Sequence, residues 1–112
     1  MNFFDISKMP GKQMAPGSEG KFIHSENNTI SFWNIAAGTI IPLHHHVHES
    51  TLILLEGQIK MTIGEETRLI ESGMVAYVPS NITHHAEVLT NCRMIDIFFP
   101  LREEFTKPVI KS

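Results

Sequence analysis

Histidines are concentrated in two short parts of the chain. Six of the seven lie either in residues 43–49, which read LHHHVHE, or in the His-His pair at residues 84–85. Alternate side chains of an extended strand share one face, with same-face Cα atoms about 6–7 Å apart. His44 and His46 are therefore expected to point the same way, with His48 as a further candidate. Because neutral imidazole binds Zn, Fe, Ni, Cu or Mn, the pattern predicts a site for one divalent transition metal.

Turn-forming residues divide the chain into short segments rich in β-branched and aromatic residues. Gly and Pro recur about every ten residues, a spacing typical of an all-β sandwich or barrel. Within residues 58–63, Ile59, Met61 and Ile63 alternate with polar residues, as in a half-buried strand. Strands are expected at residues 21–24, 29–36, 51–56, 58–63, 67–70, 74–78, 83–89 and 93–99.

The length of 112 residues suits one domain with a single core. Residues 1–20 contain several Gly and Pro residues and are expected to form an irregular N-terminal arm. Residues 21–105 form the predicted barrel, and residues 106–112 form a C-terminal tail.

Composition excludes several classes of protein. The net charge of −3 gives no electrostatic basis for binding nucleic acid. The longest apolar run, Leu52–Leu55, is far shorter than the ~20 residues of a membrane span. The single cysteine, Cys92, excludes an internal disulfide and fits a reducing compartment. We therefore expect a cytoplasmic protein that binds neither nucleic acid nor membrane.

The spacing around the histidines resembles the two sequence motifs of the cupins. In the first, five residues separate Gly38 from His44-x-His46, and Gly57 follows. In the second, five residues separate Gly73 from Pro79, and His84 follows. The resemblance implies a cupin-type double-stranded β-helix, or jelly-roll barrel.

The cupin resemblance also implies a ligand set for the metal. His44, His46 and His84 match the family's histidine ligands, whereas the family's Glu or Gln position falls on Ser50 or Thr51. The fourth ligand therefore stays open between Ser50, Thr51 and His48. The implied cofactor is one divalent transition metal, such as Zn, Ni, Mn or Fe.

The ending of the last expected strand carries a charged group among apolar residues. Residues 96–103 read DIFFPLRE, and period-2 geometry places Asp96 and Phe98 on one face. On the residues alone, Asp96 and Arg102 either form an ion pair that closes the strand or take part in chemistry. A buried carboxyl suits proton transfer, and the forked guanidinium of Arg suits a carboxylate partner.

This ending resembles that of small single-domain cupins of the pectin-degradation type, which linearise 4,5-unsaturated uronates. The resemblance implies that Asp96 moves protons, Phe98 shapes a pocket and Arg102 holds the carboxylate of a small anionic sugar. Two alternatives stay open: an iron dioxygenase with three histidine ligands, and a cupin that binds a small molecule without turning it over. Apolar residues on the outer strand face (Ile95, Ile97 and Phe99) further predict a homodimer.

Overall fold

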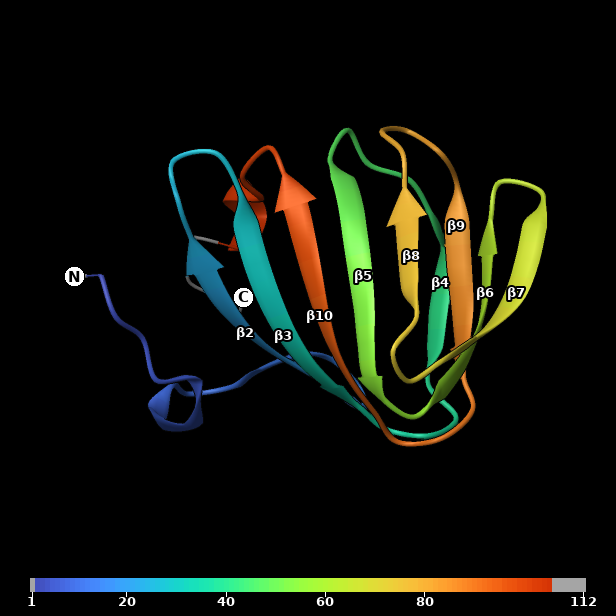
Figure 1. Ribbon diagram of the computed structural model, residues 1–112, viewed down its shortest axis with the longest axis horizontal. Helices are drawn as coiled ribbons and strands as arrows, with labels where there is room; N and C mark the ends of the chain where they lie inside the picture. Colours follow the sequence, from blue (N-terminus) through green and yellow to red (C-terminus); the bar gives the residue numbers. More distant parts are fainter. Residues whose placement is uncertain (1, 106–112) are drawn as a thin grey trace, which may run out of the picture.

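The computed structural model describes residues 2–105, which form two antiparallel sheets packed face to face (Figure 1). The first three strands of the chain lie side by side in the larger sheet, and the later strands are divided between the two sheets. In chain order the elements are η1 (Ile6–Lys8), β1 (Lys12–Ala15), β2 (Ser18–His24), β3 (Thr29–Ile35), β4 (Ile40–His44), β5 (Glu49–Glu56), β6 (Gln58–Ile63), β7 (Glu66–Glu71), β8 (Val75–Val78), β9 (His84–Val88), β10 (Cys92–Phe99) and η2 (Glu103–Phe105).

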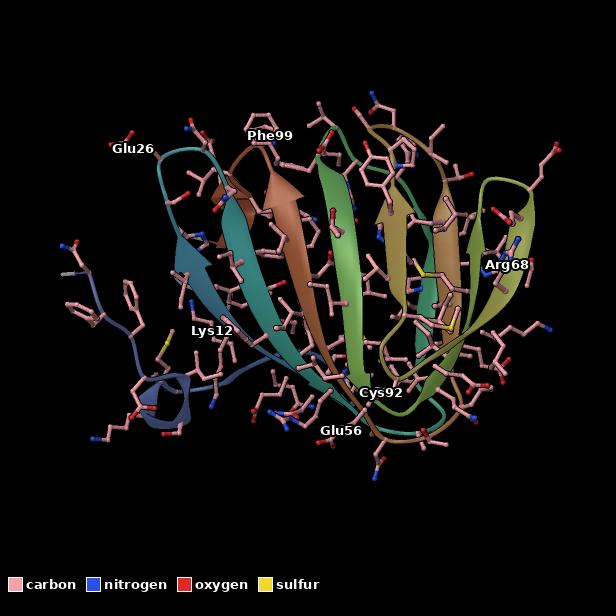
Figure 2. All side chains as sticks on the ribbon, in the orientation of Figure 1. Lys12, Glu26, Glu56, Arg68, Cys92 and Phe99 are labelled. Carbon is pink, nitrogen blue, oxygen red and sulfur yellow. The ribbon has the colours of Figure 1, made fainter. Side chains whose placement is uncertain are left out.

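The larger sheet has six strands in the order β1-β2-β3-β10-β5-β8. The last strand, β10, lies between β3 and β5, where Asp96 pairs with Ser31 on one side and Leu52 on the other. Cys92 and Phe99 mark the opposite ends of this strand in Figure 2. A strand hydrogen-bonded on both sides is a rigid support, so the side chains of β10 are held at fixed positions.

The smaller sheet has four strands in the order β4-β9-β6-β7. The hairpin of β6 and β7 turns through Gly64 and Glu65, with Ile63 paired to Glu66 and a φ of 59° at Gly64. A two-residue turn with positive φ is typical of β-hairpins. This turn joins the two strands expected at residues 58–63 and 67–70.

The core lies between the two sheets and follows from the period-2 pattern of the strands. In β5, Leu52 and Leu54 are buried, and Ile53 between them faces outward. In β6, Ile59 and Met61 are buried, as their alternation predicts. The all-β jelly-roll prediction is confirmed, because both sheets are antiparallel and each turns its apolar face to the other.

Two turn residues of the cupin motifs adopt the left-handed conformation. Gly57 has a φ of 99°, and a Cβ there would lie 2.5 Å from the carbonyl oxygen of Asn91. Asn81, which lies between Pro79 and His84 of the second motif, has a φ of 62°. Asn tolerates this conformation better than most residues, so the motif keeps its turn.

The N-terminal prediction was wrong in part. Residues 12–15 form β1 and residues 18–20 begin β2, so much of the expected irregular arm belongs to the larger sheet. Pro16 and Gly17 form the turn between these strands rather than an unstructured segment. The predicted tail at 106–112 lies outside the described residues. No helix within residues 2–105 is long and apolar enough to cross a membrane.

Candidate metal and acid–base site

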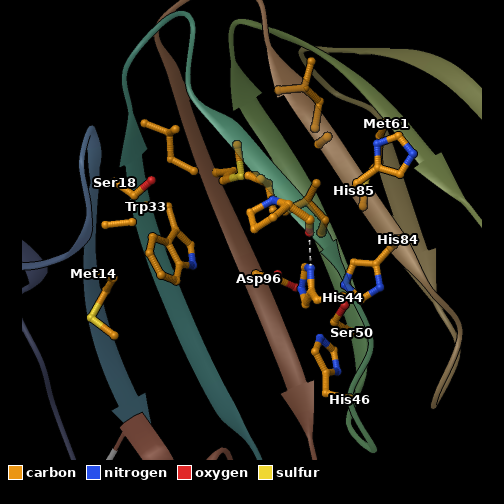
Figure 3. A pocket seen from close by; sticks show the side chains of 18 of the residues that line it. Met14, Ser18, Trp33, His44, His46, Ser50, Met61, His84, His85 and Asp96 are labelled. Atoms are coloured by element: carbon orange, nitrogen blue, oxygen red, sulfur yellow. Dashed lines mark hydrogen bonds between the residues drawn. The ribbon is translucent and has the colours of Figure 1, made fainter.

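A cavity of about 250 Å³ lies between the two sheets. Its walls are mostly apolar, and its polar groups gather at one end. Figure 3 shows His44, His46, His84, Ser50 and Asp96 at that end, and Met14, Ser18 and Trp33 at the other. A pocket with a few convergent polar groups is the usual form of a small-molecule site.

Three histidines predicted as ligands come together in the fold. Their ligand atoms, on His44, His46 and His84, all lie within 4.8 Å of one another. The ring centroids of His44 and His84 are 4.1 Å apart, and those of His46 and His84 are 5.0 Å apart. The cluster joins β4 to its neighbour β9, where His44 and His84 are register partners. This donor set is consistent with one metal ion.

The route by which the histidines converge differs from the prediction. Of the histidines in residues 43–49, His44 lies in a strand, as the last residue of β4. His46 and His48 lie in the loop before β5. The assumption that these histidines share the period of one extended strand is therefore wrong beyond His44. The loop that carries His46 is fastened to the loop between β8 and β9, where the backbone N–H of Asn81 donates to the carbonyl of His46 at 2.8 Å.

Each histidine of the cluster is fixed in one tautomer by a backbone carbonyl two residues away. Nδ1 donates to the carbonyl of Pro42 in His44 (2.7 Å), of His48 in His46 (2.8 Å) and of Ile82 in His84 (2.9 Å). A carbonyl oxygen only accepts, so all three Nδ1 atoms carry the proton. The unprotonated Nε2 atoms are left as ligands, which is the orientation that metal-binding histidines take.

Burial keeps two of these rings neutral. It lowers the pKa of His46 from 6.5 to about 4, against a smaller opposing effect of the hydrogen bond to His48. It also lowers the pKa of His84, with further lowering by the charges of His44 and Arg102. Metal coordination requires neutral imidazole, so both shifts favour the binding of a cation.

The three candidates for a fourth ligand lie in different places. Ser50 is buried and lines the cavity. Thr51 follows it on β5 and therefore faces the outer side of the sheet, where it pairs with Ile97 and Tyr77. The ring of His48 lies 5.7 Å from that of His46, outside the three-histidine cluster. Ser50 is thus the candidate that the fold places beside the histidines.

His45 and His85 are exposed and lie outside the cluster. His85 contributes to the rim of the cavity, and Figure 3 shows its ring apart from the three clustered rings. The first histidine stretch therefore divides into residues that meet at the cavity and residues that face solvent.

Asp96 lines the same cavity from the opposite sheet. Its Oδ1 is buried, and within residues 2–105 it has no hydrogen-bond partner. Burial raises the pKa of Asp96 from 3.8 to about 7, although the charge of Arg102 opposes the shift. A carboxyl that is half protonated near neutral pH can both donate and accept a proton.

Arg102 lines the cavity together with Phe98 and Phe105, but its ion-pair partner is not Asp96. Its Nε donates to Glu104, and its guanidinium carbon lies 4.7 Å from the ring centroid of Phe98 and 4.5 Å from that of Phe105. The structural alternative of an Asp96–Arg102 pair is therefore wrong for this structure. Sequence reasoning missed Glu104 and Phe105, although both follow Arg102 directly in the sequence LREEF.

The fold and the histidine cluster together define a small cupin with a candidate metal site. The model of the cupin-domain family matches residues 31–98, more than half of the chain, and the chain belongs to this family. The family assignment made from the two motifs is confirmed.

The comparisons with individual proteins show the same fold at low identity. The structure of KdgF from Halomonas sp. superposes with a TM-score of 0.88 at 21% identity, covering 93% of this chain and 99% of that one. An RmlC-like cupin from Shewanella frigidimarina gives a TM-score of 0.89 at 20% identity, with 94% and 96% covered. An uncharacterized protein of Streptomyces coelicolor is 24% identical over 102 residues, 89% of this chain and 97% of the relative.

Proposed function

We propose that this protein is a metal-dependent enzyme that moves a proton on a small organic acid. The observation that carries the proposal is Asp96, a buried carboxyl with a pKa of about 7 and an unpartnered oxygen, in the same cavity as the three clustered histidines. Titratable groups with strongly shifted pKa values gather at functional sites. A role in packing alone offers no reason to bury such a group beside a cation-binding cluster.

The residues that line the cavity have different roles in the proposed reaction, according to where they lie. Arg102 packs against two aromatic rings, those of Phe98 and Phe105, so its guanidinium is oriented to bind the carboxylate of a substrate. Phe98 forms part of the cavity wall between Arg102 and the histidines, with its ring 5.9 Å from that of His46. Asp96 takes or gives the proton. A divalent ion on the three Nε2 atoms would act as a Lewis acid that polarises and orients oxygens of the substrate.

The particular reaction follows from resemblance. Small cupins of the pectin-degradation type, the type to which KdgF belongs, linearise 4,5-unsaturated uronates, and we propose the same substrate class here. In that isomerisation, a proton leaves the anomeric hydroxyl, the ring C–O bond breaks, and the released enol regains a proton at carbon to become a ketone. No atom is gained or lost. Asp96 is suited to these transfers because both of its protonation states are populated near neutral pH.

The test is a direct assay of the purified protein, loaded separately with Zn, Ni, Mn or Fe(II), on a 4,5-unsaturated galacturonate monosaccharide. Ring opening removes the conjugated enol ether, so ultraviolet absorbance should fall without oxygen consumption. Oxygen uptake that depends on Fe(II) would instead indicate dioxygenase chemistry. Tight binding of the uronate to the metal-loaded protein without any product would show a binding protein and overturn the proposal.

We also propose that the protein forms a homodimer through the outer face of the six-stranded sheet. Apolar side chains on that face are open to solvent in the single chain: Phe99 is 54% exposed, Val75 56% and Tyr77 52%. Exposed apolar patches of this kind favour association, and a two-fold dimer is the commonest solution. The solution mass should be that of a dimer at micromolar concentration, and Val75→Lys should shift it toward the monomer. A monomeric wild-type protein would contradict this.

A further inference from the structure

The segment that carries Arg102 is attached to the barrel through a buried hydroxyl. Beyond β10, the backbone N–H of Arg102 donates to Oγ1 of Thr29 at 2.9 Å. Thr29 is completely buried at the start of β3, where it pairs with Phe98 on one side and His24 on the other. This contact therefore fixes the backbone of Arg102 relative to β3 at the point where the chain after β10 lines the cavity.

His24 also hydrogen-bonds to the Thr29 hydroxyl, and its second ring nitrogen determines which atom is the donor. Its Nδ1 lies 2.9 Å from Oγ1 of Thr29, and its ring also hydrogen-bonds to the backbone of Phe105. The Phe105 carbonyl only accepts, so the single N–H of neutral His24 points there and Nδ1 accepts from the Thr29 hydroxyl. The Thr29 oxygen in turn accepts from Arg102. The chain of hydrogen bonds fastens both ends of the segment 102–105 to β2 and β3.

The fastened segment covers the cavity with aromatic and charged groups. The ring of Phe105 lies 4.6 Å from that of Phe22, 5.9 Å from that of Phe98 and 6.5 Å from that of Trp33. Phe105, Phe98, Trp33 and Arg102 all line the cavity. The guanidinium of Arg102 stacks on Phe98 and Phe105, so its direction depends on where Phe105 is held.

We propose that His24 and Thr29 are positioning residues: together they form a latch that holds the segment 102–105 closed over the cavity and so sets the pose of Arg102. Neither residue belongs to the histidine cluster, and neither lines the cavity. The role assigned to Arg102 in binding a carboxylate rests on the proposed function; the latch itself does not.

The latch has a built-in response to acid. Burial lowers the pKa of His24 below 6.5, and the charge of Lys12 on β1 lowers it further, against the raising effect of Phe105. A protonated ring would place a second N–H against the Thr29 hydroxyl, whose own proton would then lack a partner in a fully buried position. The closed state is therefore fully stable above pH 6.5 and loses stability as the pH falls below 6.5.

The chain's single tryptophan reports on the latch without any substrate. Trp33 lines the cavity beneath Phe105, so opening of the segment exposes its indole to a quencher. Thr29→Val, which keeps the shape but removes the hydroxyl, should raise acrylamide quenching of Trp33 roughly twofold or more, as expected of local opening. Thr29→Ser should restore quenching close to the wild-type level. Thr62→Val, which removes a hydroxyl from the β6–β7 hairpin, is the matched control and should have no effect.

His24→Gln tests the same latch when Thr29→Val does not fold. The wild-type protein should show increased Trp33 quenching as the pH falls from 7.5 to 5, whereas the uncharged Gln variant should show a flat profile. Unchanged quenching in a folded Thr29→Val protein, or an unchanged pH response in His24→Gln, would overturn the latch.

Substrate kinetics then separate the latch from the proposed function. With an unsaturated uronate as the probe, Thr29→Val should raise KM about fivefold to tenfold with a smaller change in kcat, the loss expected of one hydrogen bond, and Thr29→Ser should rescue it. If quenching responds as predicted but neither Thr29→Val nor Arg102→Lys changes uronate binding, the latch stands and the carboxylate role of Arg102 falls.

Discussion

The two sheets contribute different chemistry to one cavity. The four-stranded sheet and the loop after β4 carry the three clustered histidines, and the Nδ1 of each of these three donates to a backbone carbonyl. The six-stranded sheet carries Asp96, whose Oδ1 is buried without a partner in the described part of the chain. The Nδ1 atoms of the three clustered histidines therefore have their hydrogen-bond partners before any ligand arrives, whereas, within residues 2–105, Oδ1 of Asp96 does not.

This difference separates binding from reaction. Histidines fixed in one tautomer lose little orientational freedom when a cation binds, so their wall is organised in advance. An unpartnered buried carboxyl costs stability, and such groups are retained where they serve a reaction. We interpret the histidine wall as the binding half of the site and the β10 wall as the proton-transfer half.

Breaking the histidine wall should remove both the bound metal and any activity that depends on it. His84→Ala should reduce metal affinity by at least about 10–100-fold, since it removes a ligand and not merely one of its supporting partners. The same loss is expected for His44→Ala and His46→Ala. Titration with Zn or Ni followed by elemental analysis measures it. His85→Ala is the matched control on β9, and an equal loss in that variant would contradict the assignment.

Replacing Asp96 on the β10 wall should abolish turnover and leave metal binding intact. Asp96→Asn keeps the shape of the side chain but cannot relay a proton, so kcat should fall by about 10²–10⁴-fold. Metal content and the melting temperature should not decrease. A variant that melts much earlier and yet turns over normally when folded would return Asp96 to a structural role.

The pH dependence of stability offers a test of Asp96 that needs no substrate. Its pKa of about 7, against 3.8 ordinarily, means that the folded state holds the proton more tightly than the unfolded state. Asp96 therefore lowers the free energy of unfolding as the pH rises from about 4 to 7. In metal-free protein, Asp96→Asn should be more stable than the wild type above pH 7, by on the order of a few kcal/mol, and the gap should close toward pH 4.

Urea unfolding at a series of pH values measures this gap. Asp5→Asn is the matched control, because Asp5 is the chain's other aspartate and is exposed near the N-terminus. A gap that does not change with pH would mean that the pKa of Asp96 is ordinary.

The smallest expected effect concerns the binding of the substrate carboxylate by Arg102. Arg102→Lys keeps the charge but loses the planar fork and the stacking on two rings, so carboxylate binding should weaken by about tenfold. Calorimetric titration of a uronate into metal-loaded protein measures it. Arg93→Lys is a suitable control because Arg93 is exposed and pairs with Glu56, away from the cavity. Equal effects in both variants would point to charge alone.

The sequence was most informative where local rules act over short distances. Alternation in residues 58–63 predicted which side chains of β6 are buried, and the glycine and histidine spacing predicted the cupin family. The same local rules placed Asp96 and Phe98 on one face of β10, and both line the cavity. These outcomes depend on the pleat of a strand and on turns of a few residues.

Local rules failed where a contact joins distant segments or where a loop bends. The pairing of β1 with β2 and β2 with β3 draws residues 12–20 into the sheet, although their Gly and Pro content suggested an irregular arm. His46 reaches the metal cluster from a loop, so the strand period that predicted its direction did not apply.

The sequence by itself determined the fold family, the strand faces and the identity of the clustered histidines, because these depend on residue types at short, regular spacings. Only the tertiary structure decided the tautomers of the histidines, the partner of Arg102 and the link from Thr29 to Arg102, which are 73 residues apart. Burial, which raises the pKa of Asp96 and lowers that of His46, depends on which segments the closed barrel brings together, and no local pattern encodes that.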